Sequence, residues 1–334
     1  MRGLSDFDWT LLSLPPRHFR WRIRGNPLSW WPQLSAASPG DWDGIVATSA
    51  VDLATLKGCF PALQKLPSLL YLHENQFAYP RSNAQHDSVD PQMVNLYGAL
   101  AADRLVFNSA FNLDSFFHGL DNLFVQLPDR IDSAILDTLR WKATVIPVGL
   151  ESDVFETAAE RARLPVHEGP LRIVWNHRVE YDKGVDQLYL IASLLEARKV
   201  PFELVLLGQR FKQSPPEWQK LIREFGHRIV ENGFLPSREA YLERLRQCDI
   251  VLSTTHHEFQ GLSVMEAVVC GCCPVVPDRL AFPGYFGPAY RYESPEQAVD
   301  CILKAKTLPT PDLSAFAWSA LLPRYRDEIA ALWG

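Results

Sequence analysis

Two glutamates and a glycine stand close together in the second half of the chain. In the stretch His256–Glu266, Glu258 follows an apolar run, and Gly261 stands where a helical pattern begins. Gly261 permits a tight turn and a close approach of the backbone to a ligand, and the free N–H groups of the following helix form an anion site. Glu266 falls about a turn later, where it can accept hydrogen bonds from ribose hydroxyls. The alternative is a helix-cap residue followed by a solvated glutamate.

Two basic residues bracket an earlier loop, Asn176–Gly184. Arg178 and Lys183 both follow the apolar run Leu171–Trp175, so both can point at one diphosphate. A guanidinium offers a bidentate fork and an ammonium a mobile point charge. The alternative is that Arg178 pairs on the surface with Glu180 or Asp182.

A histidine follows an apolar run in the first half of the chain. His73 lies in the segment Leu70–Pro80, where its imidazole can face a sugar hydroxyl or a leaving phosphate, although a structural role is an equal alternative. Ser109, after the apolar run Leu105–Phe107, is predicted to cap a helix.

The stretch Arg17–Arg24 is basic and aromatic. Arg20, Arg22 and Arg24 recur with period two, so an extended segment places them on one face and Trp21 on the other. Arginines interleaved with aromatic residues suit an RNA backbone and stacked bases. A solvated edge strand that covers an apolar inner face is an equal alternative.

The second half of the chain alternates apolar runs with helical patterns, which predicts βαβ units and a parallel sheet covered on both faces. We expect strands at 171–175, 202–207, 229–230, 250–253 and 274–276, and helices at 184–199, 216–225, 237–247, 261–269 and 295–306.

The first half repeats this pattern less regularly. Strands are expected at 9–14, 44–47, 69–72, 105–107 and 144–147, and helices near 50–57, 91–102, 110–118 and 131–139. Two doubly wound α/β domains follow, with ligands expected at the carboxyl ends of the strands. We expect a first domain at 1–150, a linker at 151–169, a second domain at 170–312 and a C-terminal helical segment at 313–334.

The composition excludes several classes of protein. The chain has 334 residues, 47% of them apolar and 22% charged, with a formal charge of −6, which is typical of a folded domain with a core and not of a disordered chain. No apolar stretch is long enough to cross a bilayer, and the segment Met1–Asp6 contains no apolar region of a secretory signal. We therefore expect a cytoplasmic protein and no general nucleic-acid coat.

Two further patterns are interpreted as structural. The pairs Asp6/Asp8 and Asp41/Asp43 match a D-x-D pattern but lie away from the other motifs, so we interpret them as turn residues. The cysteines of the segment Cys270–Cys273 lie between an apolar helix and an apolar strand without a second ligand pair, which indicates core residues. We expect no metal site and no cofactor.

These motifs together carry a resemblance. Glu258 with Glu266 resembles the E-x7-E signature of retaining GT-B glycosyltransferases, and Arg178 with Lys183 resembles their R-x4-K phosphate clamp. A narrower similarity, to the tRNA-queuosine α-mannosyltransferase family, rests on the segments Tyr71–Gln76, Val106–Asn112, Trp175–Arg178, His257–Phe259, Glu266–Cys272 and Phe19–Arg22. It extends from about Leu11 to the C-terminal helix, which in this fold returns to the first domain.

The resemblance implies transfer of mannose from GDP-mannose to queuosine in a tRNA anticodon. It implies that Arg178 and Lys183 hold the diphosphate, and that Glu258 holds hydroxyls of the sugar. The remaining implied donor contacts are His73, Gly233, Phe234, Leu235, Gly261, Leu262 and Glu266, and the implied acceptor contacts are Arg20, Trp21, Arg22, Arg24 and Asn75. Two alternatives remain: a GT-B enzyme with a lipid or polysaccharide acceptor, and a nucleotide-sugar or RNA-binding homologue without catalysis.

The chain departs from the family pattern at its start. Family members begin with a strand and a glycine-rich loop that faces the donor phosphates and the acceptor. Only a few residues precede the strand expected at 9–14 here, so we expect that first strand and loop to be absent.

Overall fold

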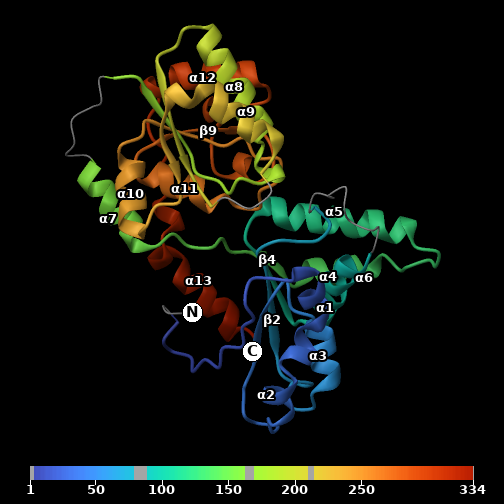
Figure 1. The fold of residues 1–334 in the computed structure, drawn as a ribbon. Coiled ribbons are helices and arrows are strands. Elements are labelled where there is room, and N and C mark those ends of the chain that lie inside the picture. The colour runs from blue at the N-terminus through green and yellow to red at the C-terminus, as the bar shows by residue number, and fades with distance from the viewer. Residues whose placement is uncertain (1–3, 79–88, 162–168, 210–213, 334) are drawn as a thin grey trace. The chain divides into compact units, whose positions relative to one another are not determined.

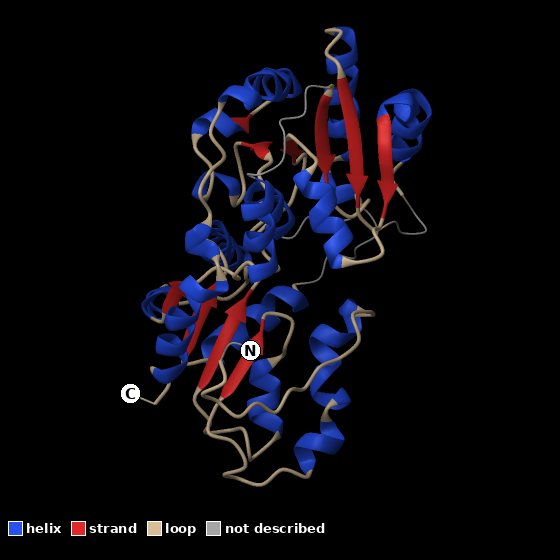
Figure 2. Cartoon of the chain, turned by 90° about the vertical axis from the view of Figure 1, so that its left-hand side faces the viewer, coloured by secondary structure: helices blue, strands red, loops and turns tan. Residues whose placement is uncertain are grey.

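The structure is a computed structural model that describes residues 4–78, 89–161, 169–209 and 214–333. Its chain divides into two compact units, residues 1–147 with 321–334 and residues 148–320. Each unit contains a parallel sheet, whose strands are drawn in red in Figure 2.

The first unit is built on strands that pair in the order in which they occur in the chain. The order is β1 (Ile45–Thr48), β2 (Ser68–Leu72), β3 (Arg104–Phe107) and β4 (Ala143–Val145), and all pairings are parallel. The helices of this unit are α1 (Phe19–Ser29), α2 (Trp31–Ser35), α3 (Leu53–Cys59), α4 (Asp90–Ala101), α5 (Ala110–Gln126) and α6 (Ala134–Trp141).

Both faces of this sheet are covered. Leu70 and Phe107 pack with α3, α4, α5 and α6, whereas Leu69 and Val106, one residue away on each strand, point to the other face. There they pack with Ile329 of helix α13 (Trp318–Ala330). The last residues of the chain thus belong to the first unit, as expected (Figure 1).

The second unit has the strand order β10-β9-β8-β5-β6-β7, again parallel. Its elements are α7 (Ser152–Arg161), β5 (Leu171–Trp175), α8 (Val185–Ala197), β6 (Phe202–Leu207), α9 (Pro216–Phe225), β7 (Ile229–Gly233), α10 (Arg238–Arg246), β8 (Ile250–Leu252), α11 (Leu262–Val269), β9 (Cys273–Pro277), β10 (Arg291–Tyr292) and α12 (Pro295–Lys304). Figure 1 shows α8, α9 and α12 together on one face of this sheet; α7, α10 and α11 cover the other.

The order of the strands indicates where a ligand is expected to bind in the second unit. From β5 the chain moves outward to β6 and β7, and then returns to β8 on the other side of β5. Such a reversal opens a crevice at the carboxyl ends of the two central strands. The two loops that follow β5 and β8 are those that carry Arg178, Lys183, Glu258 and Gly261.

Three expectations about local structure were wrong. Residues 9–14 form no strand, although most of them are apolar. The basic stretch is not extended, because α1 begins at Phe19, and Asn26 holds this helix by donating to the Ala50 carbonyl and accepting from the Asp52 N–H. The expected linker 151–169 begins with helix α7, which packs against α10 and α11.

Candidate active site

Hydrogen bonds join the two loops at the centre of the second sheet. Thr254 and Thr255 donate from their hydroxyls to the carbonyls of Lys183 and Asp182, at 2.9 and 3.0 Å, and the His256 N–H donates to the Asp182 carbonyl at 2.7 Å. Buried backbone carbonyls in a loop need such partners. The two loops therefore form one rigid platform.

Gly184 makes this close approach feasible. Its φ is 67°, and a Cβ at this position would lie 1.9 Å from the backbone oxygen of Thr254. We expect Gly184→Ala to lower the free energy of unfolding by about 3 kcal/mol or more, since both the left-handed backbone and the clash oppose it. Urea unfolding measures this. Gly226→Ala is the control, because no heavy atom lies within 4 Å of a Cβ there; equal losses in the two variants would contradict the prediction.

Lys183 lies at the centre of the platform, where its side chain is 12% exposed. Its ammonium donates to the His257 carbonyl at 3.0 Å and lies 3.5 Å from Glu258 Oε2 and 3.2 Å from Asp182 Oδ2. The Glu258 side chain is 19% exposed. A largely buried cation and carboxylate at hydrogen-bonding distance form a polar site that can receive an anion and hydroxyl groups.

Arg178 lies on the rim of the site. Its side chain is 55% exposed and pairs with Glu180 at 3.1 Å, which is the surface pairing given above as the alternative. An exposed ion pair stabilises a protein by only about 0–1 kcal/mol. Little free energy is therefore lost when a phosphate displaces Glu180 from the guanidinium of Arg178.

The amino end of helix α11 completes the anion site. Gly261 precedes it with a φ of 82°, and a Cβ there would lie 2.9 Å from the Phe282 ring. No side chain of the described residues caps this end of the helix, so its first N–H groups are available to a ligand beside Leu262.

A network around Glu266 was not foreseen from the sequence. Arg238 Nη1 lies 2.6 Å from Glu266 Oε1, and the Tyr241 hydroxyl donates to Oε2 at 3.3 Å. Arg238 also pairs with Asp153 at 3.0 Å, and Asn176 donates to the Tyr241 hydroxyl. Burial and the charge of Glu266 raise the pKa of Tyr241, which keeps this hydroxyl a donor. Arg238 opens α10 directly after the serine cap at Ser237, but no spacing rule links it to Glu266.

His177 lies buried beneath the platform. Burial above all, and the charge of Lys183, lower the pKa of His177 from 6.5 to about 3. Below pH 6.5 the unfolded chain binds a proton that the folded chain excludes, so stability falls as the pH falls from 6.5 towards 3.

We expect this histidine to remove about 1.6 kcal/mol of stability between pH 6.5 and 5. Urea unfolding at these two pH values should show a shallower loss in His177→Asn than in the wild type. His227→Asn, at an exposed position, is the control and should keep the wild-type slope. Parallel pH profiles of His177→Asn and the wild type would contradict the assignment.

The segment Gly233–Leu235 ends β7 at the same edge of the sheet. The Gly233 carbonyl accepts from the Gly208 N–H at 3.1 Å, Phe234 is 79% exposed, and Leu235 packs against the core. The contact of this segment with a nucleotide stays a prediction.

In the first unit, His73 and Asn75 follow strand β2. His73 is half-buried, with Nδ1 3.5 Å from the Ser49 hydroxyl. Asn75 is fully buried; it donates to the Asn112 carbonyl and side chain and accepts from the Phe77 N–H. Because its amide is engaged within the unit, the expectation that Asn75 contacts an acceptor was wrong.

Helix α1 rearranges the basic stretch. Positions 20 and 24 fall on one face of the helix, and the side chain of Arg20 lies outside the described residues. Trp21 is 58% exposed, and Arg24 pairs with Asp52 at 2.8 Å. Arg22 has a buried Nη1 without a hydrogen-bond partner in the described residues.

The structural interpretation of the cysteines is confirmed. Cys270, Cys272 and Cys273 are buried in the hydrophobic core of the second unit. Among the residues that the structure describes, no group of three or more histidine, cysteine, aspartate or glutamate side chains is arranged to hold a metal ion, and no helix is long and apolar enough to cross a membrane.

Two family models match the chain. Residues 1–150 match the N-terminal region of tRNA-queuosine alpha-mannosyltransferases, and residues 156–307 match the group 1 glycosyl transferases. Among solved structures, the UDP-forming trehalose-phosphate synthase of Burkholderia xenovorans aligns with a TM-score of 0.61, 15% identity, and coverage of 96% of this chain and 76% of that one. Anabaena HepE, solved with UDP, aligns with a TM-score of 0.60, 16% identity, and coverage of 86% and 79%.

The fold and the matched models define a GT-B glycosyltransferase, which confirms the expected class. The chain is 31% identical over 294 residues to the tRNA-queuosine alpha-mannosyltransferase of Drosophila melanogaster, covering 85% of this chain and 75% of that protein. The chain belongs to the tRNA-queuosine alpha-mannosyltransferase family. A shorter similarity, 29% identity over 41% of this chain and 34% of the relative, joins it to a D-inositol 3-phosphate glycosyltransferase of Arthrobacter.

Proposed function

We propose that this protein transfers mannose from GDP-mannose to the queuosine of a tRNA, with retention of the anomeric configuration. The observation that carries the proposal is the platform at the centre of the second sheet. It holds a largely buried ammonium, a largely buried carboxylate and the amino end of a helix without a side-chain cap among the described residues, on two loops joined by hydrogen bonds. The choice of sugar and acceptor rests on membership of the family.

The donor fits this platform through its charges and hydroxyls. The diphosphate is proposed to bind Lys183, Arg178 and the first N–H groups of α11 after Gly261. The two side chains supply positive charge, and the N–H groups donate hydrogen bonds. Glu258 is proposed to accept from hydroxyls of the sugar, and Glu266 from those of the ribose. The backbone at Gly233–Leu235 is proposed to line the pocket of the base.

The Glu266 carboxylate accepts from one partner on each of its oxygens, and an exchange of the Arg238 contact would free Oε1 for a ribose hydroxyl. Arg238 also pairs with Asp153, so its guanidinium keeps a carboxylate partner when Glu266 turns to the ribose. Tyr241 continues to donate to Glu266 and fixes its direction. We therefore add Arg238 and Tyr241 to the proposed donor site as positioning residues.

The transfer needs no nucleophile from the protein. In a front-face mechanism the bond between the sugar C1 and the diphosphate oxygen breaks while the acceptor hydroxyl bonds to C1 on the same face. The proton of that hydroxyl passes to the departing diphosphate oxygen. The chemical contribution of the protein is to stabilise the charge that develops on the diphosphate, which preorganised cations and N–H groups do effectively.

The acceptor side is proposed to lie on the first unit. His73, at the end of β2, is proposed as a contact of the sugar on the strength of the resemblance. Helix α1 presents Trp21, an exposed aromatic ring of the kind on which an RNA base stacks, among arginines that suit phosphates.

Mass spectrometry of tRNA tests the proposed function. Queuosine-containing tRNA incubated with the protein and GDP-mannose should gain the mass of one hexose on the queuosine nucleoside. The same tRNA without queuosine, and UDP-glucose in place of GDP-mannose, are the controls. If GDP-mannose binds but no product forms with queuosine tRNA, the acceptor assignment is wrong.

The proposed contact of α1 with RNA predicts a change in salt dependence. The double variant Arg20→Gln, Arg24→Gln should reduce the slope of log affinity for tRNA against log salt by about 1 to 2, because each lost phosphate contact removes somewhat less than one released counterion. Arg223→Gln, an exposed arginine of the second unit, is the control. An unchanged slope in the double variant would place the RNA elsewhere.

A further inference from the structure

Four buried asparagines join the loops at the carboxyl edge of the first sheet. They are Asn75, Asn95, Asn108 and Asn112, and none is more than 4% exposed. Their side-chain amides bind backbone groups at the ends of β1 and β2 and at the start of α5, which follows β3. A buried polar network whose members are paired is rigid. The loops after β1, β2 and β3 are therefore held in one arrangement.

This network fixes the backbone of His73. Asn108 Nδ2 donates to the His73 carbonyl at 2.9 Å, and Asn112 Nδ2 donates to the carbonyl of Leu72 at 2.7 Å. Asn108 Oδ1 accepts from Asn112 Nδ2 at 2.8 Å, so the two amides also hold each other. With the backbone fixed, only rotation about the two side-chain bonds of His73 decides where its imidazole points.

Ser49 restrains that rotation from the loop after β1. Its N–H donates to the Tyr71 carbonyl at 3.0 Å, and its carbonyl accepts from Asn95 Nδ2 at 2.9 Å, which fixes its own backbone. Its hydroxyl oxygen lies 3.5 Å from Nδ1 of His73. In the absence of substrate, hydrogen bonds of active-site side chains are often this long and shorten when the substrate binds.

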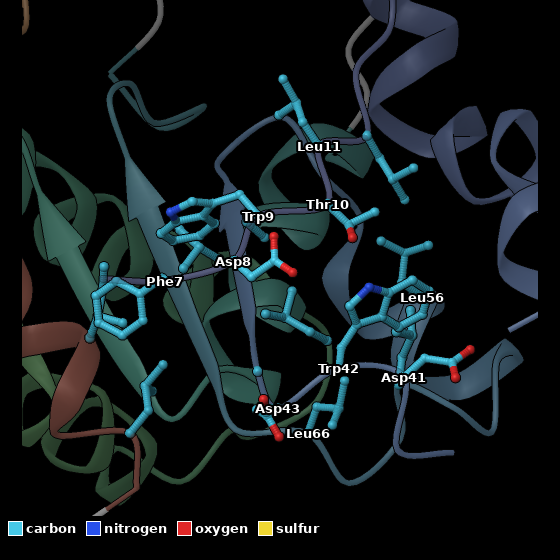
Figure 3. A pocket seen from close by; sticks show the side chains of 18 of the residues that line it. Phe7, Asp8, Trp9, Thr10, Leu11, Asp41, Trp42, Asp43, Leu56 and Leu66 are labelled. Atoms are coloured by element: carbon cyan, nitrogen blue, oxygen red, sulfur yellow. The ribbon is translucent and has the colours of Figure 1, made fainter. Parts of the chain in front are cut away.

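The surroundings of the Ser49 hydroxyl decide which of the two groups donates. Ser49 is 3% exposed, and the cavity of about 740 Å³ drawn in Figure 3 is lined by residues 45–48 of β1 but not by Ser49. Among the described residues, Nδ1 of His73 is the one hydrogen-bonding partner of this hydroxyl. A buried hydroxyl proton without an acceptor is unfavourable, so the hydroxyl is expected to donate to Nδ1.

We propose that Ser49 is a positioning residue that makes His73 a hydrogen-bond donor. When the Ser49 hydroxyl donates to Nδ1, the neutral imidazole carries its proton on Nε2. An Nε2–H group binds a hydroxyl or phosphate oxygen but takes up no proton. His73 is thus excluded as the base, in keeping with passage of the acceptor proton to the diphosphate. The inference rests on the proposed function only in that the oxygen belongs to a substrate of the transfer.

Nitrogen NMR of the free protein tests the position of the proton. Spectra of the full chain with ¹⁵N-labelled histidine distinguish a protonated from an unprotonated ring nitrogen, and comparison with His73→Asn assigns the signals among the nine histidines. At about pH 8.5, two units above the ordinary pKa of histidine, we expect His73 to carry its proton on Nε2 and to accept a hydrogen bond at Nδ1. A proton on Nδ1 would overturn the proposal.

Variants of Ser49 test whether this residue sets the state of His73. In Ser49→Ala we expect the Nδ1 signal to move to that of a nitrogen without a hydrogen bond, and kcat for mannose transfer to fall about 5- to 20-fold, because the imidazole is no longer oriented. Ser49→Thr keeps a hydroxyl and should restore the Nδ1 signal and most of the activity. Ser133→Ala, at an exposed serine of the same unit, is the control.

The spectra and the rates together separate this inference from the proposed function. If no mannose is transferred but the His73 signals behave as expected, Ser49 positions His73 and the assigned reaction is wrong. If Ser49→Ala loses activity while the His73 signals stay as in the wild type, or keeps full activity, the role given to Ser49 is wrong. Should Ser49→Ala fail to fold, the wild-type spectrum by itself decides the position of the proton.

Discussion

Replacement of Lys183 by alanine is expected to lower kcat/KM for mannose transfer by about 10³-fold. Lys183 is the most buried cation of the platform, and it lies within 3.5 Å of two carboxylates and one carbonyl. In the proposed reaction its ammonium meets the charge that develops on the departing diphosphate, and removal of one such preorganised group costs about 10²–10³ in rate. Weaker binding of the GDP-mannose donor lowers kcat/KM further.

The measurement is single-turnover transfer together with donor binding, which separates the chemical step from affinity. Lys306→Ala, at an exposed position on the same unit, is the control. Alanine leaves Asp182 and Glu258 without their cation, so thermal unfolding of the variant must be recorded as well. A folded Lys183→Ala protein with near wild-type turnover would remove Lys183 from the mechanism.

Replacement of Glu258 by glutamine is expected to lower kcat by about 10²-fold or more with little change in thermal stability. Glutamine keeps the size of the side chain but removes the charge that pairs with Lys183 and accepts from sugar hydroxyls. A site that holds hydroxyls with a buried carboxylate loses orientation of the sugar when the carboxylate is replaced, and misplacement of reacting atoms is costly.

Glu293→Gln, at an exposed position, is the control. Because Lys183 and Glu258 are in contact, the effects of the two substitutions on the activation free energy should not add. The fold loss of activity in the double variant should therefore be much smaller than the product of the two single-variant losses. If the two changes in activation free energy added exactly, Lys183 and Glu258 would act independently of each other. Full activity of Glu258→Gln would show that the hydroxyls of the donor are held by other groups.

The surroundings of Glu258 and Glu266 could be predicted from the sequence to different extents. Glu258 was assigned from its place between a strand and Gly261, and the structure puts it beside Lys183, a residue 75 positions earlier in the chain. Glu266 was assigned from its spacing alone, and its partners Arg238 and Tyr241 were missed. Those partners lie on a different helix, and no local pattern carries information about which helices pack side by side on one face of a sheet.

The sequence predicted the second sheet almost completely. Strands β5 and β6 were expected with the bounds that the structure shows, because a strand covered on both faces requires an uninterrupted apolar run. Gly184 and Gly261 marked the two loops, since only glycine adopts their backbone conformation without strain. Fold class, family and the order of motifs along the chain were therefore determined by residue type and spacing.

Only the tertiary structure decided which local preferences prevail. The largely apolar segment Trp9–Leu14 was expected to be a strand, but a strand requires a hydrogen-bonded neighbour, and none of the described strands pairs with it. The period of Arg20 to Arg24 suggested an extended segment, but the contacts of Asn26 with residues 50 and 52 hold that stretch as a helix. Contacts with residues distant in the chain decide whether such a segment is a helix, a strand or neither. The reason is that local propensities contribute less free energy than the hydrogen bonds and packing of tertiary contacts.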